Sequence, residues 1–298
     1  MRTLCLGEAL VDLICEQPVG GLAEAPAFVP HFGGGPANVA VNARRAGAQI
    51  AVGGGVGDDA WGRRLRGELA EEGVELDFFS LISGVRTPLA VVAVDETGEP
   101  EWEFYGEDLA TLARGLGKRG IDRAVAACDG LFFGSDRLVA EHERHLAMRA
   151  RERALEAGKA VLFDANLRLE RWRTAAEAAS YANACVPGAF LVRTNLPEAR
   201  VMTGERDPEA AALALLKGGA RNVVITLGPD GAILRGQLRA DAPGVEANVV
   251  STVGAGDALM GTLVGRATLT GFYPAALAAS LGEAVTAAAR ATERWGAL

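Results

Sequence analysis

Short apolar runs alternate with segments of helical periodicity along most of this 298-residue chain. The runs expected as strands are 2–10, 49–57, 128–135, 159–167, 189–195 and 221–228, and the segments expected as helices are 36–48, 59–73, 140–158, 196–204 and 256–269. Strands that are apolar on both faces belong to parallel sheets covered by helices on each side. The pattern therefore predicts an α/β fold, in which ligands bind beyond the carboxyl ends of the strands.

One section departs from this alternation. Residues 85–105 read "VRTPLAVVAVDETGEPEWEFY", two extended runs around a segment rich in Asp, Gly and Pro. This arrangement predicts a β-hairpin. In its second run Trp102 and Phe104 fall on one face, and Glu101, Glu103 and Tyr105 fall on the other. A hairpin inserted into an α/β domain is expected to act as a lid or as a dimer surface; an ornamental edge hairpin is the alternative.

Charge and hydropathy limit the partners. The formal net charge is −8, which disfavours nucleic acid as a main partner. No apolar run reaches the length that spans a bilayer, so we expect no membrane association. Glu8 and Asp12 interrupt the first apolar stretch, which is therefore expected as a buried strand rather than a signal peptide. The four cysteines show no metal-site spacing and indicate free thiols in a reducing cytoplasm.

The stretch "STVGAGDALMG" (251–261) is the most suggestive local motif. It follows a run, 237–250, whose end is expected as a strand, and it begins the helix expected over 256–269. Helix N-termini present unpaired N–H groups, and glycines let an anion approach them closely. Asp257 stands beside that site, where a carboxylate can accept a proton from an attacking hydroxyl. The plain alternative is that Asp257 only caps the helix. No GxxxxGK[ST] motif is present, so any phosphate chemistry must use backbone N–H groups and arginine.

The motif resembles the C-terminal signature DTxGAGD of the ribokinase/PfkB sugar-kinase family. The family's N-terminal signature is matched by "GGGPANVAVNARRAGAQIAVGGGVGDDAWG" (33–62), and four linking motifs follow in the family's order: "FGS" (133–135), "FDANLR" (163–168), "NLPEARVMTG" (195–204) and "VVITLGPDGA" (223–232). The resemblance implies a ribokinase-like three-layer sandwich with a mostly parallel central sheet. It further implies one kinase domain over 1–298, with a small β lid formed by about 9–20 and 85–106.

The resemblance also implies an ATP-dependent sugar kinase. Asp257 would be the catalytic base, and Gly254, Ala255 and Gly256 would form the anion hole for the transferred phosphoryl group. Asn195 and Glu198 resemble the family's NxxE motif, which organises Mg²⁺ and phosphate through water; a helix cap is the alternative for this pair. Thr226, Gly228 and Gly231 resemble its nucleotide-side loop, where ordinary strand-to-turn chemistry is the alternative.

For the sugar, the resemblance assigns Asp12 to hydroxyl binding and matches Gly33, Gly34 and Asn38 to the family's GGxxxN. Thr87, Phe104 and Tyr105 would cover the sugar, and Arg168 would reach a phosphate or an acidic substrate group, unless it forms a surface ion pair. The motifs look most like the fructokinase and 2-keto-3-deoxygluconate kinase branches. Fructose is therefore the expected substrate, with 2-keto-3-deoxygluconate or a non-catalytic binding protein as alternatives.

Three positions depart from the family's pattern. Val285 falls where relatives often carry Asn near the adenine, which leaves the nucleotide preference open. Gly106 stands where fructokinase-like relatives often carry arginine. Ser251 replaces the acid that helps to bind a monovalent cation, so activation by K⁺ is in doubt. A homodimer formed through the hairpin is also expected from the resemblance.

Overall fold

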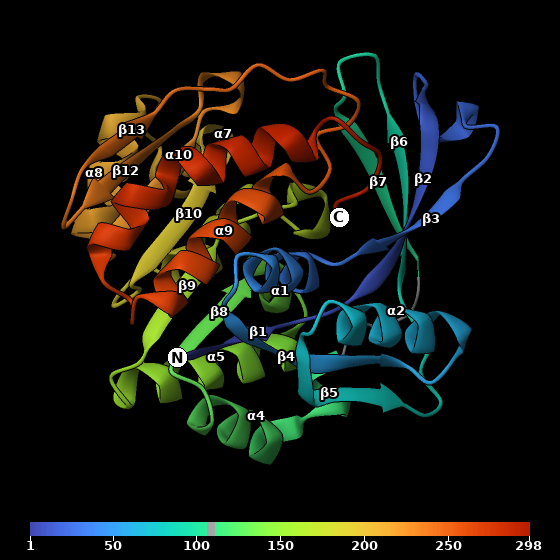
Figure 1. Cartoon of the computed structure of the whole chain (residues 1–298), viewed down its shortest axis with the longest axis horizontal. Helices are drawn as coiled ribbons and strands as arrows, with labels where there is room; N and C mark the ends of the chain where they lie inside the picture. The colour runs from blue at the N-terminus through green and yellow to red at the C-terminus, as the bar shows by residue number, and fades with distance from the viewer. Residues whose placement is uncertain (106–110) are drawn as a thin grey trace.

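A nine-stranded sheet forms the centre of the protein, in a computed structural model that describes residues 1–105 and 111–298 (Figure 1). Gly106, the end of the expected lid segment, lies outside the described residues. The strand order is β13-β12-β11-β10-β9-β8-β1-β4-β5. The bounds are β1 Arg2–Leu6, β4 Gln49–Gly57, β5 Glu75–Ile82, β8 Gly130–Gly134, β9 Ala160–Asp164, β10 Leu191–Asn195, β11 Asn222–Thr226, β12 Ala232–Gly236 and β13 Ala240–Ala242.

Strands β1, β4, β5 and β8 to β11 run parallel to one another. At one edge β12 pairs antiparallel with β11, and β13 pairs antiparallel with β12. Successive side chains of a strand point to opposite faces. In β9, Val161 and Phe163 therefore enter one hydrophobic core while Leu162 enters the other. Strands buried on both faces explain the unbroken apolar runs in the sequence.

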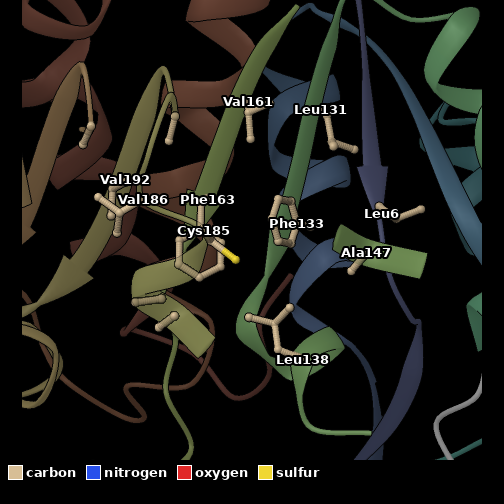
Figure 2. Close-up of a cluster of buried hydrophobic side chains, with 14 of the residues drawn as sticks. Leu6, Leu131, Phe133, Leu138, Ala147, Val161, Phe163, Cys185, Val186 and Val192 are labelled. Carbon is tan, nitrogen blue, oxygen red and sulfur yellow. The ribbon is translucent and has the colours of Figure 1, made fainter. Parts of the chain in front are cut away.

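Helices cover both faces of this sheet. One face packs against α3 (Thr111–Gly115), α4 (Gly117–Ala126), α5 (Glu141–Glu156), α6 (Ala175–Ala184), α7 (Leu196–Thr203) and α8 (Pro208–Lys217). Figure 2 shows part of that core, in which Phe133 and Phe163 from neighbouring strands lie 5.2 Å apart between ring centroids. The other face packs against α1 (Gly35–Arg45), α2 (Ala60–Glu71), α9 (Ala255–Leu269) and α10 (Pro274–Ala291). The expected three-layer arrangement is confirmed.

A second, four-stranded sheet has the order β3-β2-β6-β7, with bounds β2 Leu10–Pro18, β3 Val29–Gly33, β6 Leu89–Val94 and β7 Pro100–Tyr105. We call it the small sheet. Strands β6 and β7 are the expected hairpin, paired antiparallel. The exposure of β7 alternates as expected, with Trp102 and Phe104 less exposed than their neighbours. Strand β3 is an addition that the sequence did not indicate.

Two expected strands differ in the structure. The run 2–10 is not one strand, because β1 ends at Leu6 and β2 begins at Leu10 in a different sheet. Only Ala240–Ala242 is a strand within 237–250. After it the chain is held by isolated bonds, with the N–H of Val250 donating to the carbonyl of Thr292 and that of Thr252 donating to the carbonyl of Gly98.

Val253, just before α9, and the C-terminal residues Trp295 and Ala297 lie against the small sheet. Ile14, Val92 and Val94 of that sheet form a third hydrophobic cluster with Val253 and Ala297, and Trp102 and Trp295 pack against it. Figure 1 shows the C-terminus near the small sheet and the N-terminus at the start of β1, away from the small sheet. Among the described residues no helix has the length and apolar character needed to cross a bilayer.

Candidate active site

The loop before α9 has the geometry expected of an anion-binding helix start. Gly254 caps the helix with φ +81°, a left-handed conformation that favours glycine. The first helical hydrogen bond runs from the N–H of Ala258 to the carbonyl of Gly254. Among the described residues the N–H groups of Gly256 and Asp257 have no hydrogen-bond partner. These donors and the positive end of the helix dipole face the same space.

Asp257 lies in the first turn of α9 and is held by a residue from α1. The side-chain amide of Asn38 donates to Asp257 Oδ2 at 2.8 Å. Burial raises the pKa of Asp257 to about 6, against the lowering effects of Asn38, Arg168 and Arg193. Asn38 is 3% exposed, and its Oδ1 has no partner among the described residues. That oxygen can accept a hydrogen bond from a ligand hydroxyl.

Asp12 projects from β2 into the same cavity. It is buried, yet no hydrogen bond to its carboxyl group is present among the described residues, so backbone N–H groups do not satisfy this acid. Burial raises the pKa of Asp12 to about 8. A Cβ added at Gly33 would lie 2.3 Å from Asp12 Oδ2, so this glycine makes room for the carboxyl group.

Aromatic rings and arginines form one wall of the cavity. Trp102 and Phe104 of β7 stack with ring centroids 6.0 Å apart and an interplanar angle of 7°. The guanidinium of Arg168 lies 4.4 Å from the Trp102 centroid, and that of Arg171 lies 5.2 Å from the Phe104 centroid. Neither arginine makes an ion pair with a described residue. The surface ion pair considered for Arg168 is therefore absent from the described residues.

A charged cluster lies at the end of the cavity, and sequence reasoning missed it. Arg137, fully buried, pairs with Glu8 at 2.7 Å and with Glu143 at 3.1 Å. Burial raises the pKa of Glu8 to about 7, whereas, despite burial, Arg137 and Arg171 hold the pKa of Asp136 below its usual value. Charges directly after buried strands were the available signal, since Glu8 follows β1 and Asp136 follows β8.

Asn195 and Glu198 form a complete capping box at the start of α7. The N–H of Glu198 donates to Asn195 Oδ1 at 2.8 Å, and Glu198 Oε2 accepts from the N–H of Asn195 at 2.9 Å. Glu198 Oε1 also accepts from the N–H of Leu167 at 2.9 Å, which ties α7 to the loop that carries Arg168. The cap considered for this pair is confirmed.

Glu198 Oε2 also accepts from the hydroxyl of Thr194 at 3.3 Å. Asn195 Oδ1 and Glu198 Oε1 can each accept one further hydrogen bond, which suits contact with a hydrated Mg²⁺ better than direct coordination. No group of three or more His, Cys, Asp or Glu side chains within 1–105 and 111–298 has the arrangement of a metal site.

Several expected site residues lie outside the cavity lining. Thr87 donates its N–H and its hydroxyl to the carboxylate of Asp59, the cap of α2, so its donors serve that helix. Tyr105 is 50% exposed on the face of β7 opposite Phe104, because neighbouring residues of a strand alternate. Neither side chain lines the cavity, and Thr87 has a structural role as a partner of the α2 cap.

Residues expected on the nucleotide side lie further along the same sheet edge. Thr226 ends β11, while Gly228 and Gly231, both with positive φ, form the turn into β12. The hydroxyl of Thr226 accepts a hydrogen bond from Arg193 at 3.0 Å. The cavity itself brings together Asp12, Gly34, Asn38, Phe104, Arg168, Gly254 and Asp257 from the expected set.

Comparisons with known proteins give the family of the chain. The sequence model described as "pfkB family carbohydrate kinase" matches residues 2–297. Fructokinase-2 of Solanum habrochaites is 32% identical over 260 residues, which cover 87% of this chain and 79% of the relative. The chain belongs to the pfkB family of carbohydrate kinases. It is a sugar kinase, a phosphotransferase with an alcohol group as acceptor.

Solved structures show the same ribokinase-like fold. A fructokinase double mutant from Vibrio cholerae O395, bound to fructose, ADP and potassium ion, matches 99% of this chain and 93% of its own with 28% identity and a TM-score of 0.85. Aminoimidazole riboside kinase from Salmonella enterica, complexed with aminoimidazole riboside and an ATP analog, matches 100% of this chain and 95% of its own with 25% identity and a TM-score of 0.84.

Proposed function

We propose that the protein transfers the γ-phosphoryl group of ATP to a hydroxyl of fructose. The observation that carries the proposal is the position of Asp257 in the cavity, at a helix start where the N–H groups of Gly256 and Asp257 have no partner among the described residues. The N–H of Ala255, in contrast, donates to the carbonyl of Thr252. Fructokinases among the relatives support the choice of sugar.

In this proposal the sugar hydroxyl lies against Asp257, whose carboxylate accepts the proton as the oxygen attacks phosphorus. The N–H groups of the loop stabilise the charge that develops on the transferred group, and ADP leaves. Asp12, Asn38 and Arg168 hold the remaining hydroxyls, while Gly33 and Gly34 allow close approach. Phe104 and the small sheet act as a lid that excludes water.

The nucleotide lies over Thr226, Gly228 and Gly231 in this proposal. Asn195 and Glu198 hold Mg²⁺ through water, and the ion would supply charge neutralisation on the phosphates. Thr87 and Tyr105 are left out of the proposed substrate contacts because their positions do not reach the cavity.

A second candidate substrate is 2-keto-3-deoxygluconate. The observation in its favour is that Arg168 and Arg171 line the cavity without an ion pair to a described residue. A substrate carboxylate would accept hydrogen bonds from these guanidinium groups.

A coupled ADP-release assay with Mg-ATP tests both candidates, using fructose, 2-keto-3-deoxygluconate, ribose, glucose and adenosine. We expect the highest kcat/KM with fructose. The matched variant Asp257→Asn should lower kcat by about 10²- to 10⁴-fold, the usual contribution of a general base, and retain nucleotide binding. A wild-type protein that binds sugar or ATP without turnover on any sugar would instead be a non-catalytic binding protein.

A further inference from the structure

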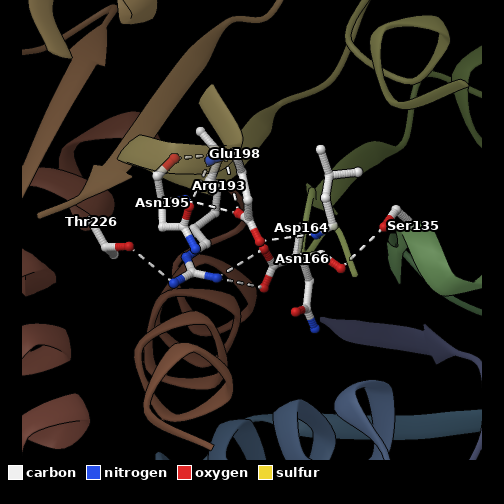
Figure 3. A network of polar contacts seen from close by, with 9 residues as sticks. Ser135, Asp164, Asn166, Arg193, Asn195, Glu198 and Thr226 are labelled. Atoms are coloured by element: carbon white, nitrogen blue, oxygen red, sulfur yellow. Dashed lines mark hydrogen bonds and ion pairs between the residues drawn. The ribbon is translucent and has the colours of Figure 1, made fainter. Parts of the chain in front are cut away.

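Arg193 lies in the middle of three adjacent strand ends and bonds to both neighbours. Its Nη1 donates to Asp164 of β9, at 3.2 Å from Oδ1, and its Nη2 donates to Thr226 of β11 at 3.0 Å (Figure 3). The residue is 7% exposed. One side chain therefore connects the strand that precedes Arg168 with the strand that leads to the proposed nucleotide loop.

The guanidinium also lies directly beneath the loop that starts α9. A Cβ added at Gly256 would stand 2.9 Å from both Nη1 and Nη2 of Arg193. The backbone of Gly256 does not have a positive φ, so conformational freedom is not the reason for glycine at this position. The missing side chain makes room for the arginine.

The Arg193 guanidinium lies near three carboxylates but forms hydrogen bonds with only one of them, Asp164. Arg193 Nε is buried without a partner, and Glu198 and Asp257 act on the guanidinium in addition to Asp164. Burial raises the pKa of Asp164 to about 7 in spite of the arginine. Asp164, Glu198 and Asp257 thus share one cation, which lies beside the loop and the base. The charged groups that act on Asp257 from the surrounding elements are Asp12 of β2, Asp136 after β8, Asp164 of β9, Arg168 after β9 and Arg193 of β10.

We propose that Arg193 is a positioning residue of the phosphoryl-transfer site, which supports the Gly254–Asp257 loop from beneath and keeps a positive charge against it. This inference rests on the proposed function. The side chain of Arg193 contributes in two ways. Its hydrogen bonds to Asp164 and Thr226 fix the guanidinium against the loop and so set the geometry of the loop. Its positive charge favours the ionised form of Asp257.

Two variants separate these contributions. Arg193→Met removes both, so kcat should fall on the order of 100-fold, as misplaced reacting groups do. The acidic limb of its kcat/KM–pH profile should move upward by about one pH unit, because a nearby cation is lost. Arg193→Lys keeps the charge but cannot bond Asp164 and Thr226 together. Its kcat should fall about tenfold with the acidic limb unmoved.

Matched controls exclude a general effect of losing a buried arginine. Arg235, on strand β12 next to the edge strand β13, is 6% exposed and pairs with Glu209 and Asp241 away from the cavity. Arg235→Met should lower the melting temperature and leave the pH profile unchanged. Asp164→Asn removes an acid rather than a cation, so the acidic limb of the kcat/KM–pH profile of this variant should not move upward.

A double-mutant cycle tests the contact with the loop. Gly256→Ala should reduce kcat strongly in the wild-type protein, because its Cβ meets the guanidinium. The same change should cost at least tenfold less in Arg193→Met, where that clash is relieved. Additive losses would overturn the inference, as would an unmoved acidic limb in Arg193→Met.

The outcomes are distinguishable from failure of the proposed function. A wild-type protein without sugar-dependent ADP release overturns the proposed function. An active wild-type protein whose Arg193 variants behave like Arg235→Met overturns only the role of Arg193. If Arg193→Met fails to fold, Arg193→Lys with and without Gly256→Ala carries the test, and an unchanged kcat in Arg193→Lys overturns the proposal.

Discussion

Removing the amide of Asn38 should shift the pH at which the base becomes active. The variant Asn38→Ala loses the hydrogen bond of 2.8 Å that the side-chain amide donates to Asp257 Oδ2. Bonds to charged groups contribute about 1.5–3 kcal/mol, and one pKa unit corresponds to about 1.36 kcal/mol. The bond stabilises the ionised carboxylate, so its loss should raise the pKa of Asp257 by about one to two units.

Activity requires the deprotonated base, so kcat/KM rises with pH through the pKa of Asp257, which is about 6 in the intact protein. In Asn38→Ala the limb should move to roughly pH 7–8. At pH 6 the ionised fraction then falls roughly 5- to 50-fold, and this part of the loss should disappear above pH 9. Any loss that persists at high pH reports the missing contact between Asn38 Oδ1 and the sugar.

The control is Asn42→Ala, one turn along α1. Asn42 donates to the backbone carbonyl of Asn38 rather than to Asp257. Its acidic limb should match that of the wild-type protein. An unmoved limb in Asn38→Ala, measured as kcat/KM for fructose between pH 5 and pH 9.5, would refute the assignment of Asp257 as the titrating base.

Three further results are expected. Thr87→Val should lower stability by about 0.5–2 kcal/mol in urea unfolding, because the cap of α2 loses a partner, with the KM for sugar unchanged; a rise in KM alone would favour substrate contact. Replacing KCl by NaCl should change kcat less than about twofold, because Ser251 holds only the N–H of Val253 and offers no carboxylate; strong K⁺ activation would contradict this. Light scattering should show a homodimer formed through the small sheet, whose exposed Val29 and Tyr105 would lie in the interface; a monomer at assay concentrations would be the opposite result.

The central sheet could be predicted because its buried strands are rich in apolar residues. In the run 221–228 the central residues Val223, Val224 and Ile225 place apolar side chains on both faces. Short runs of this kind between helical segments are typical of strands buried on both sides. Strand β3 could not be recognised, since "VPHFG" contains proline and histidine, residues uncommon in strands. The break between β1 and β2 was hidden because the run stays largely apolar across Gly7.

The candidate site was predictable only where a motif marks it. Asp257 and Asn38 belong to signatures, and the structure brings them within hydrogen-bonding distance. Arg137 and Arg193 belong to no signature, and arginine side chains are mostly exposed unless they are paired. Their importance depends on partners from other strands, such as Glu8 and Thr226, which only the three-dimensional structure places beside them.

The third hydrophobic cluster gives the protein its own optical reporter. Trp102 lies both in the cavity wall and against this cluster, and Trp295 packs on it from the C-terminal segment. Indole emission responds to the polarity and the charges around the ring, and Arg168 stands 4.4 Å from Trp102. Movement of the small sheet over a bound sugar should therefore change the intrinsic fluorescence without any added dye. The occupancy of the cavity can then be followed by stopped-flow mixing, separately from turnover.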